Sequence, residues 1–361
     1  MNNNKLIARI GWPRLIIAVF LVVLLVLIQT TGMGLEGLVS DALRRFGQYG
    51  VLVLAMVPGV QCGIGLNFGI SLGIVGGLLG ALVSMQLGPE YWIAMGVSES
   101  LAPLFMLVLA LVVGAALASA IGVGYGFLLN RVKGSEMTVS TYIGFSIIAF
   151  MNIAWLTLPF TRGELIWAIG GSGLRTTLTL DSAFGGVLNN FLAFTIPGTK
   201  IIIPTGLWLF FFAACFLVWL FLRSKVGMAM SAAGSNPSFA RANGINVDKM
   251  RILGTALSTA LGAIGIIVYA QSYGFLQLYN APLMMSFSCV ASVLIGGASI
   301  GRARVSHAII GTLLFQSLMT LGLPVANNII PVANLSEVMR LIISNGIILY
   351  ALTKVGGGTS K

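Results

Sequence analysis

Ser71 is the residue best placed by its neighbours to act as a nucleophile. It stands between Gly69 and Gly73 in the string GISLG, the pattern of a hydrolase serine held on a sharp turn. Such a serine needs a base within hydrogen-bond reach, and the sequence contains one histidine, His307, in the basic string GRARVSH. One distant histidine gives this chemistry little support, so we expect no catalytic residue and keep a serine hydrolase as a remote alternative.

Two glycine-rich strings resemble loops that cradle phosphates, GIGLNFG at 63–69 and GVGYG at 122–126. Neither follows a predicted strand, and neither leads into the Lys-Ser/Thr pair of a nucleotide-binding loop. Cys62, Cys215 and Cys289 lie in apolar runs and match no metal-ligand or redox spacing, so packing is their expected role. The sequence therefore predicts that this chain itself binds no cofactor and no metal ion.

The composition of the chain indicates a lipid environment. Of its 361 residues, 57% are hydrophobic and 8% are charged, with a mean hydropathy of +1.00, whereas soluble domains carry about 25% charged residues. The apolar runs last for roughly 17 to 25 residues, which suits helices that cross the hydrocarbon core better than the about 10 alternating residues of a barrel strand. We therefore expect an all-α polytopic membrane protein with a single domain over 1–361.

About ten transmembrane helices are expected, and an even number places both termini on one side of the membrane. The first apolar run follows several bases, as in a secretory signal, but it is rather long for one and is predicted to remain as an uncleaved span. The predicted spans are 15–32, 46–62, 66–86, 101–130, 138–158, 202–223, 250–272, 283–298, 306–323 and 338–354.

The distribution of charge predicts that both termini lie in the cytoplasm, because Lys and Arg accumulate in cytoplasmic loops. In this orientation the inner acids are only Glu136 and Asp248. The net charge of +11 is then an orientation signal, and no nucleic-acid partner is expected. The inner set holds most of the 20 Lys and Arg residues: Lys5, Arg9, Arg14, Arg131, Lys133, Arg223, Lys225, Arg241, Lys249, Arg251, Arg302, Arg304, Lys354 and Lys361.

Two loops stand out by their length. The outer segment 159–201 mixes polar and apolar residues, which predicts short helices at the membrane interface and a surface for an external protein. The inner loops are short except for 224–249, which is strongly polar between two very apolar runs. We expect the partners of this protein to contact these two segments, one on each side of the membrane.

The predicted spans lack ionisable groups at their centres, where such groups mark proton and ion pathways. The acids nearest to the spans lie at predicted ends: Glu99, Glu136, Asp248 and Glu337. This pattern argues against a transporter coupled to protons or sodium and against a redox pump. If the protein moves a solute, its energy enters from another subunit.

Small residues recur at every fourth position in three spans, and such rows let helix backbones approach closely in lipid. We expect these spans to pack tightly against other helices. The rows are Gly69, Gly73 and Gly77; Gly114, Ala118, Gly122 and Gly126; and Gly254, Ser258 and Gly262.

The inner loop contains the string GSNPSFARANGIN at 234–246, which has the signals of a short helix. Asn236 is a good N-cap, Pro237 suits the first helical position, and Gly244 suits the left-handed residue that ends a helix. The predicted helix has about seven residues and is too short to be stable alone in water. It therefore needs a surface on which to dock.

The side chains of this helix favour a protein groove as that surface. Phe239 would supply an apolar anchor, and Ser238 and Arg241 would make polar contacts with a cytoplasmic partner. The alternative is an interfacial helix that lies against lipid headgroups. Local chemistry alone does not decide between the two.

Three strings resemble one known family, the permease subunits of bacterial ABC importers of the ribose and simple-sugar type. VGMAMSAAGSNPSFARANGINVDKM at 226–250 is similar to the cytoplasmic-loop signature of that family. GIGLNFGISLG at 63–73 and VLIGGASIGRARVSHAIIGTLLF at 293–315 are similar to two further family segments, in the same order. With the number of spans, the resemblance covers nearly the whole chain.

The resemblance implies a complete transport system in the inner membrane of a bacterium. Two permease subunits, identical or related, would lie side by side in the bilayer above two ATPase subunits that hold ATP and Mg²⁺, beneath a periplasmic or lipid-anchored solute-binding protein. The loop helix would be the coupling helix, seated in a groove of the ATPase. It would comprise Ser235, Asn236, Pro237, Ser238, Phe239, Ala240, Arg241, Gly244, Ile245 and Asn246.

A translocation path is predicted along irregular, polar or glycine-rich segments near the middle of the membrane, because such backbone is tolerated there only beside protein or water. The candidates are Asn67, Ser71, Gly296 and Gly297. Packing is the other role that these residues could have.

The expected function is import of a small polar solute by alternating access, with a monosaccharide as the first candidate and a nucleoside or furanone-type signal as the alternative. The sequence departs from the family pattern at 67–71 and at Arg302 and Arg304, which leaves the solute open and is compatible with a second, non-identical permease chain. A partner-independent channel and an intramembrane serine hydrolase are the more distant alternatives.

Overall fold

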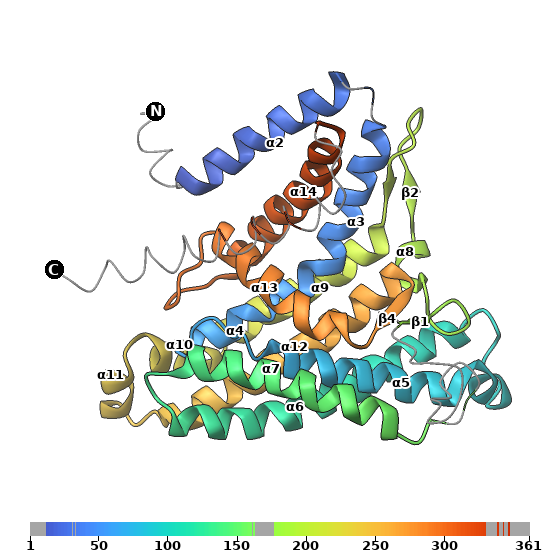
Figure 1. Ribbon diagram of the computed structural model, residues 1–361. Coiled ribbons are helices and arrows are strands. Elements are labelled where there is room, and N and C mark those ends of the chain that lie inside the picture. Colours follow the sequence, from blue (N-terminus) through green and yellow to red (C-terminus); the bar gives the residue numbers. More distant parts are fainter. Residues whose placement is uncertain are drawn as a thin grey trace.

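The computed structural model describes residues 12–329, apart from 31, 33, 161 and 163–176, and the isolated positions Val338, Ile342 and Gly346. Helices account for most of the described chain (Figure 1). The elements are α2 (Trp12–Thr30), α3 (Leu35–Leu54), α4 (Met56–Gln61), α5 (Ile70–Ala94), α6 (Ala102–Arg131), α7 (Glu136–Thr157), β1 (Thr177–Thr179), α8 (Val187–Asn190), β2 (Phe194–Thr195), β3 (Ile202–Ile203), α9 (Thr205–Arg223), α10 (Lys225–Ser235), α11 (Pro237–Ala242), α12 (Val247–Tyr273), β4 (Phe275–Gln277), α13 (Asn280–Ile295) and α14 (Val305–Ile329).

The helices are those of a polytopic membrane protein. In the described part, six helices are long and apolar enough to cross a membrane: Ile70–Ala94, Ala102–Arg131, Glu136–Thr157, Thr205–Arg223, Val247–Tyr273 and Val305–Val325. Arg14–Thr30 and Asn280–Ile295 are shorter apolar helices. Each predicted span from 15–32 to 306–323 therefore coincides with helix, whereas the predicted span 338–354 lies outside the described residues except at the isolated positions.

Several helix boundaries differ from the prediction, among them the ends of α5 at Ala94 and of α14 at Ile329, each beyond its predicted span, and the starts of α3 and α5. Helix α3 begins at Leu35, well before 46, because its first half is helical but polar, and hydropathy detects only the apolar half. Helix α5 begins at Ile70, after 66, because residues 62–69 form an irregular turn. This irregular segment is almost entirely buried.

The predicted rows of small residues hold α5, α6 and α12 together. A methyl group added at Gly76 would lie 2.9 Å from the Cα of Ala118, and one at Gly126 would lie 2.8 Å from the Cα of Ile252. Such close backbone approach confirms the expected tight packing. Figure 1 shows these helices with α7 in one layer, and α2, α3 and α14 above it.

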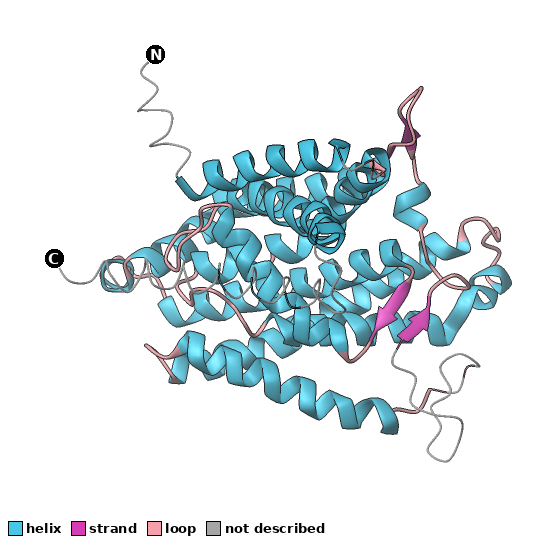
Figure 2. Ribbon diagram, turned by 45° about the horizontal axis from the view of Figure 1, so that its top comes forward, coloured by secondary structure: helices cyan, strands magenta, loops and turns pink. Residues whose placement is uncertain are grey.

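Four short strands form two antiparallel pairs that the all-α prediction did not include (Figure 2). Strand β1 pairs with β4, with Leu178 opposite Leu276, and β2 pairs with β3, with Phe194 opposite Ile203. The described part of 159–201 also contains the short helix α8, as expected. Figure 1 places these elements at the end of the molecule opposite to α11.

The cysteines are free and buried in the helical core. Cys62 and Cys289 are 0% exposed and Cys215 is 4% exposed. Cys62 also packs against Gly254 of α12, where no larger residue would fit. The predicted packing role of the three cysteines is confirmed.

Candidate functional site

Helix α11 forms as the local sequence predicts. The side chain of Asn236 accepts a hydrogen bond from the backbone N–H of Phe239 over 3.0 Å, and Pro237 occupies the first helical position. Gly244 has a φ of 77°, the left-handed conformation that favours glycine after a helix. Asn246 is also a cap, since its side chain accepts from the N–H of Lys249 in the first turn of α12.

One face of α11 rests on its own chain and the other is exposed. Ala240 is 0% exposed and packs in a small apolar cluster with Ala233 and Val247. Phe239 is 62% exposed, although it is a large apolar residue. Ser238 and Arg241 are also exposed. The chain thus holds the helix in place and presents Phe239 and Arg241 outward.

Helix α10 connects α11 to the irregular segment 62–69 by direct backbone contact. A methyl group added at Gly63, whose φ is 83°, would lie 2.8 Å from the Cα of Gly234. One added at Gly234 would overlap the carbonyl oxygen of Gln61 and lie 2.6 Å from the nitrogen of Gly63. Glycine is required on both sides of this contact. Helix α10 therefore contacts the backbone of the segment that carries Asn67 directly.

Two ion pairs tie the first turn of α12 to the turn between α6 and α7. Arg251 and Glu136 lie 2.6 Å apart with side chains only 9% and 14% exposed. Lys133 and Asp248 lie 2.6 Å apart with side chains 40% and 52% exposed. The loop that carries α11 is therefore anchored on both sides, by α10 and by α12.

Loss of Glu136 is expected to destabilise the protein strongly, because Arg251 would remain buried without its counter-charge. Glu136→Ala should cost about 3–5 kcal/mol, visible as a lower apparent melting temperature of the purified protein. The matched control is Asp248→Ala, which breaks the exposed pair and should cost about 0–1 kcal/mol. Equal losses in the two variants would contradict the burial difference.

Asn67 lies at the centre of a buried polar network. It is 0% exposed, accepts a hydrogen bond from the hydroxyl of Tyr125 over 3.0 Å, and donates to the hydroxyl of Ser258 over 3.0 Å. Ser258 in turn donates to the carbonyl oxygen of Ala55 over 2.7 Å. These bonds tie α6 and α12 to the break between α3 and α4.

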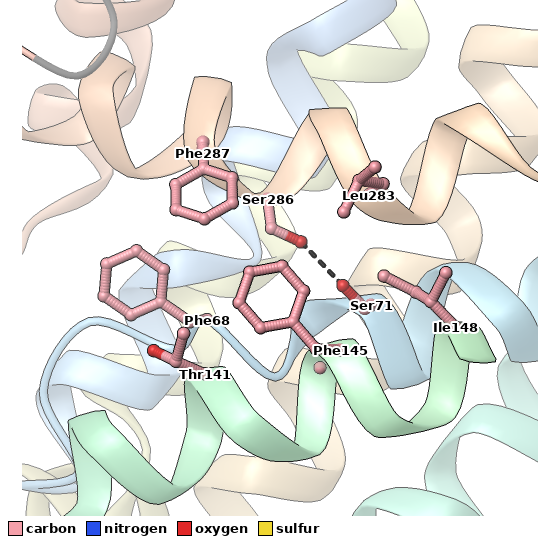
Figure 3. A pocket seen from close by; sticks show the side chains of 9 residues that line it. Phe68, Ser71, Thr141, Phe145, Ile148, Leu283, Ser286 and Phe287 are labelled. Carbon is pink, nitrogen blue, oxygen red and sulfur yellow. Dashed lines mark hydrogen bonds between the residues drawn. The ribbon is translucent and has the colours of Figure 1, made fainter. Parts of the chain in front are cut away.

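Ser71 lines a small pocket between α5, α7 and α13 (Figure 3). Its hydroxyl donates to the carbonyl oxygen of Pro282 over 2.7 Å and lies 2.8 Å from the hydroxyl of Ser286. The pocket has a volume of about 10 Å³, room for roughly one water molecule. The rings of Phe68, Phe145 and Phe287 gather around it, as Figure 3 shows.

The partners of Ser71 do not suit a hydrolase. The structure surrounds its hydroxyl with a carbonyl oxygen and another serine, neither of which is a base. His307 instead packs through its backbone against Gly296 at the end of α13. The two groups that a serine hydrolase would bring together thus have different neighbours.

Gly296 and Gly297 join α13 to the loop before α14. Gly297 has a φ of 88° and lies beneath the guanidinium of Arg14, which donates a hydrogen bond to the carbonyl oxygen of Gly296. The same loop continues to Arg302. Turn geometry and close packing account for the conformation of both glycines, and a translocation path along Asn67, Ser71, Gly296 and Gly297 stays a prediction.

Comparison with known proteins defines the class. Residues 38–352 match the family described as branched-chain amino acid transport system / permease component. The chain belongs to this family, and its resemblance to permease subunits of ABC importers is confirmed.

Among individual proteins, the chain is similar to permeases named for autoinducer 2 import. It is 27% identical over 196 residues to the autoinducer 2 import system permease protein LsrC of Shigella flexneri, covering 52% of this chain and 56% of that protein. The LsrC protein of Yersinia pestis (strain Pestoides F) is 26% identical over 179 residues, 48% of this chain and 50% of that protein. The chain thus spans about half the length of the curated relatives it matches. No solved structure matches it.

Sequence reasoning missed the contacts that support α11. The pairing of Gly63 with Gly234 and of Glu136 with Arg251 joins residues far apart in the chain. Both acid and base lie at predicted helix ends, where charged residues are expected even without a partner. The available signal was Gly234 itself, since a glycine near the end of a helix that is not its cap often marks a close backbone approach.

Proposed function

We propose that this chain is the membrane-spanning subunit of an ATP-driven ABC importer and binds no nucleotide itself. The observation that carries the proposal is α11, a capped helix that rests on its own chain through Ala240 and leaves Phe239 and Arg241 exposed. Membership of the permease family supports the same assignment. The proposed coupling residues are those predicted; Ala240 and Ile245 lie in the apolar cluster that supports α11, and Asn246 caps α12.

The energy for transport enters through a partner subunit. A separate ATPase subunit binds ATP and Mg²⁺ and receives Phe239 in a groove, and its closure moves α11 and α10 together. Because Gly234 touches the turn at Gly63, this movement displaces the segment 62–69 and the helix α5 that follows it. Rigid-body movement of packed helices of this kind opens a path alternately to the two sides.

The pocket at Ser71 favours a hydroxylated solute. Hydroxyl groups of Ser71, Ser286 and Thr141 stand beside the aromatic rings of Phe68 and Phe287, a combination that hydrogen-bonds sugar hydroxyls and covers an apolar sugar face. A volume of about 10 Å³ excludes a monosaccharide, so the pocket is closed in this conformation. A monosaccharide is the first candidate solute.

A furanone-type signal is the second candidate. The relatives named for autoinducer 2 import favour it, because that name describes a small signal molecule carried by similar permeases. A nucleoside remains a third candidate on the resemblance alone. Uptake assays with labelled solutes of the three kinds would distinguish them.

The proposed arrangement has about ten spans, both termini in the cytoplasm and the chain in the inner membrane of a bacterium. The bases at helix ends support this orientation, since Arg131 and Arg223 are the last residues of α6 and α9, and Arg241 lies on α11 itself. A second permease subunit and a solute-binding protein complete the system. Neither nucleic acid nor a metal ion takes part through this chain.

The decisive experiment changes the exposed side chain of α11. Phe239→Asp places a charge where an apolar anchor is needed, and hot-spot aromatic residues of interfaces contribute about 2 kcal/mol or more. Uptake into proteoliposomes should fall by about 30-fold or more, and the ATPase should no longer respond to solute. Phe239→Leu keeps the apolar contact and should retain most of the uptake.

Insertion into the membrane provides the necessary control. Because Phe239 is exposed and Ala240 makes the internal contact, Phe239→Asp should be produced and inserted at the wild-type level. Normal uptake by that variant would refute the coupling role of α11. Solute flux through the chain alone, without any ATPase, would show a channel instead.

A further inference from the structure

Several bases come together where the loop between α13 and α14 meets the first turn of α2. The Arg14 guanidinium donates a hydrogen bond to the carbonyl oxygen of Gly296, and Gly296 packs against the backbone of His307 in α14. Arg304 directly precedes α14, and its carbonyl oxygen accepts a hydrogen bond from the N–H of His307 over 2.9 Å. These contacts hold Arg14 beside bases that lie at the other end of the sequence.

Arg302 belongs to the same group. The N–H of Ser299 donates to the carbonyl oxygen of Arg302 over 2.9 Å, which closes the loop into a tight turn before α14. The guanidinium groups of Arg14, Arg302 and Arg304 all lie near enough to act electrostatically on His307. The N-terminus of α14 adds the positive end of its helix dipole. We refer to Arg14, Arg302, Arg304 and His307 as the basic cluster.

The basic cluster is not neutralised by any carboxylate of the described residues. The ion pairs found in that part of the chain all lie elsewhere, and the charges that act there on His307 are those of the three arginines. Arg302 and Arg304 are exposed, and their side chains make no hydrogen bond to another described residue. Like charges held together repel one another, so an anion bound among them would be stabilised.

Apolar surface continues from the basic cluster along two helices. Val19, Val22 and Val26 are exposed on α2, and Ile310 and Leu313 are exposed on α14. The two helices pack against each other, and Figure 1 shows α2 running beside α14. A ligand with an anionic head and apolar chains would match both the charge at the helix ends and the surface that follows it.

We propose that the basic cluster binds the phosphate of an anionic phospholipid, whose acyl chains cover the exposed apolar side chains of α2 and α14. Arg302 and Arg304 donate charge-assisted hydrogen bonds to the phosphate oxygens, and Arg14, held by Gly296, adds a third positive charge. Basic sites between membrane helices commonly bind anionic headgroups.

The chemistry of the site favours this ligand over three others. A zwitterionic headgroup brings an ammonium group, which would meet only like charge in the basic cluster. Free phosphate or an acidic soluble protein would contact the bases but would leave the apolar side chains of α2 and α14 uncovered.

The test uses the purified full-length chain in detergent and native mass spectrometry, which counts the lipid molecules retained as lipid is titrated in. Wild type should bind phosphatidylglycerol about tenfold or more tightly than phosphatidylcholine with the same acyl chains. Each base beside an anionic lipid contributes about fivefold in affinity. Arg302→Gln combined with Arg304→Gln should therefore weaken the binding of phosphatidylglycerol about 25-fold, whereas the corresponding double lysine variant keeps both charges and should retain most of the affinity.

The matched control is Arg131→Gln combined with Lys249→Gln, which removes two exposed bases outside the basic cluster. This control should change the affinity by less than about twofold, because exposed charges beyond a Debye length are screened. The apparent melting temperature without added lipid should equal that of wild type in every variant, since all the altered side chains are exposed.

Four results would overturn the inference. Wild type could bind the two lipids equally, or the control could lose as much affinity as the variant of Arg302 and Arg304, which would assign binding to the overall charge. Displacement of phosphatidylglycerol by inorganic phosphate at matched ionic strength would show a site for a soluble anion. Unchanged lipid binding in the variant of Arg302 and Arg304, together with loss of a copurifying subunit, would assign the basic cluster to a protein partner.

Discussion

Gly234→Ala is expected to lower solute uptake about tenfold or more while the ATPase subunits remain bound. The added methyl group would overlap the carbonyl oxygen of Gln61 and press on the nitrogen of Gly63, both of which are backbone atoms that cannot rotate away. Overpacking of this kind costs about 1–3 kcal/mol and separates α10 from the turn it contacts. Uptake into proteoliposomes and copurification of the ATPase measure the two properties separately.

The matched control for this variant is Gly124→Ala. Gly124 also lies within a helix, but a methyl group there meets nothing within 4 Å. The change should be neutral or stabilising by up to about 1 kcal/mol, since alanine favours the helix more than glycine does. Normal uptake by Gly234→Ala would show that the contact between Gly234 and Gly63 does not transmit movement from α10 to the segment 62–69. This conclusion would hold even if Phe239→Asp abolishes uptake.

Asn67→Ala should destabilise the protein by about 2–3 kcal/mol, because the Tyr125 hydroxyl would be buried without its acceptor. Tyr125→Phe removes the same hydrogen bond and leaves the buried Asn67 Oδ1 without its donor, so it should cost a similar amount, about 1–3 kcal/mol. The double variant should therefore cost less than the sum of the two single changes. The measurement is the apparent melting temperature of each variant in detergent.

The same variants test whether Asn67 also lines the path. A purely structural residue would lower uptake only in proportion to the folded protein that remains in the membrane. A residue of the path should lower the uptake rate per inserted molecule further and change the solute concentration that gives half the maximal rate. Equal uptake per molecule for Asn67→Ala and Tyr125→Phe would restrict Asn67 to structure.

The sequence was sufficient to predict the structure that depends on residues close together in the chain. The caps of α11 were predicted correctly because Asn236, Pro237 and Gly244 act within one or two turns of chain. The long apolar helices were predicted because about 20 apolar residues in a row have few other uses. The close packing of α5, α6 and α12 was likewise predicted from small residues at every fourth position.

The sequence does not predict contacts between segments far apart in the chain, or elements too short to show a hydrophobic period. The ion pair of Glu136 with Arg251 and the network around Asn67 depend on which helices become neighbours. Strands of two or three residues, such as β2 and β3, are too short to show alternation. The pocket between α3 and residues 189–204 combines two distant segments of the chain, so neither segment alone predicts it.

Because all three cysteines are buried, we expect the native protein to react only slowly with thiol reagents. Maleimides react with solvent-accessible thiolates, so a cysteine newly introduced on α11 or on the β2–β3 hairpin would be labelled ahead of the native ones. Cys62 adds a built-in reporter, since it begins the irregular segment and is 0% exposed in this conformation. Its reaction with a reagent during turnover would time the opening of that segment without any engineered change.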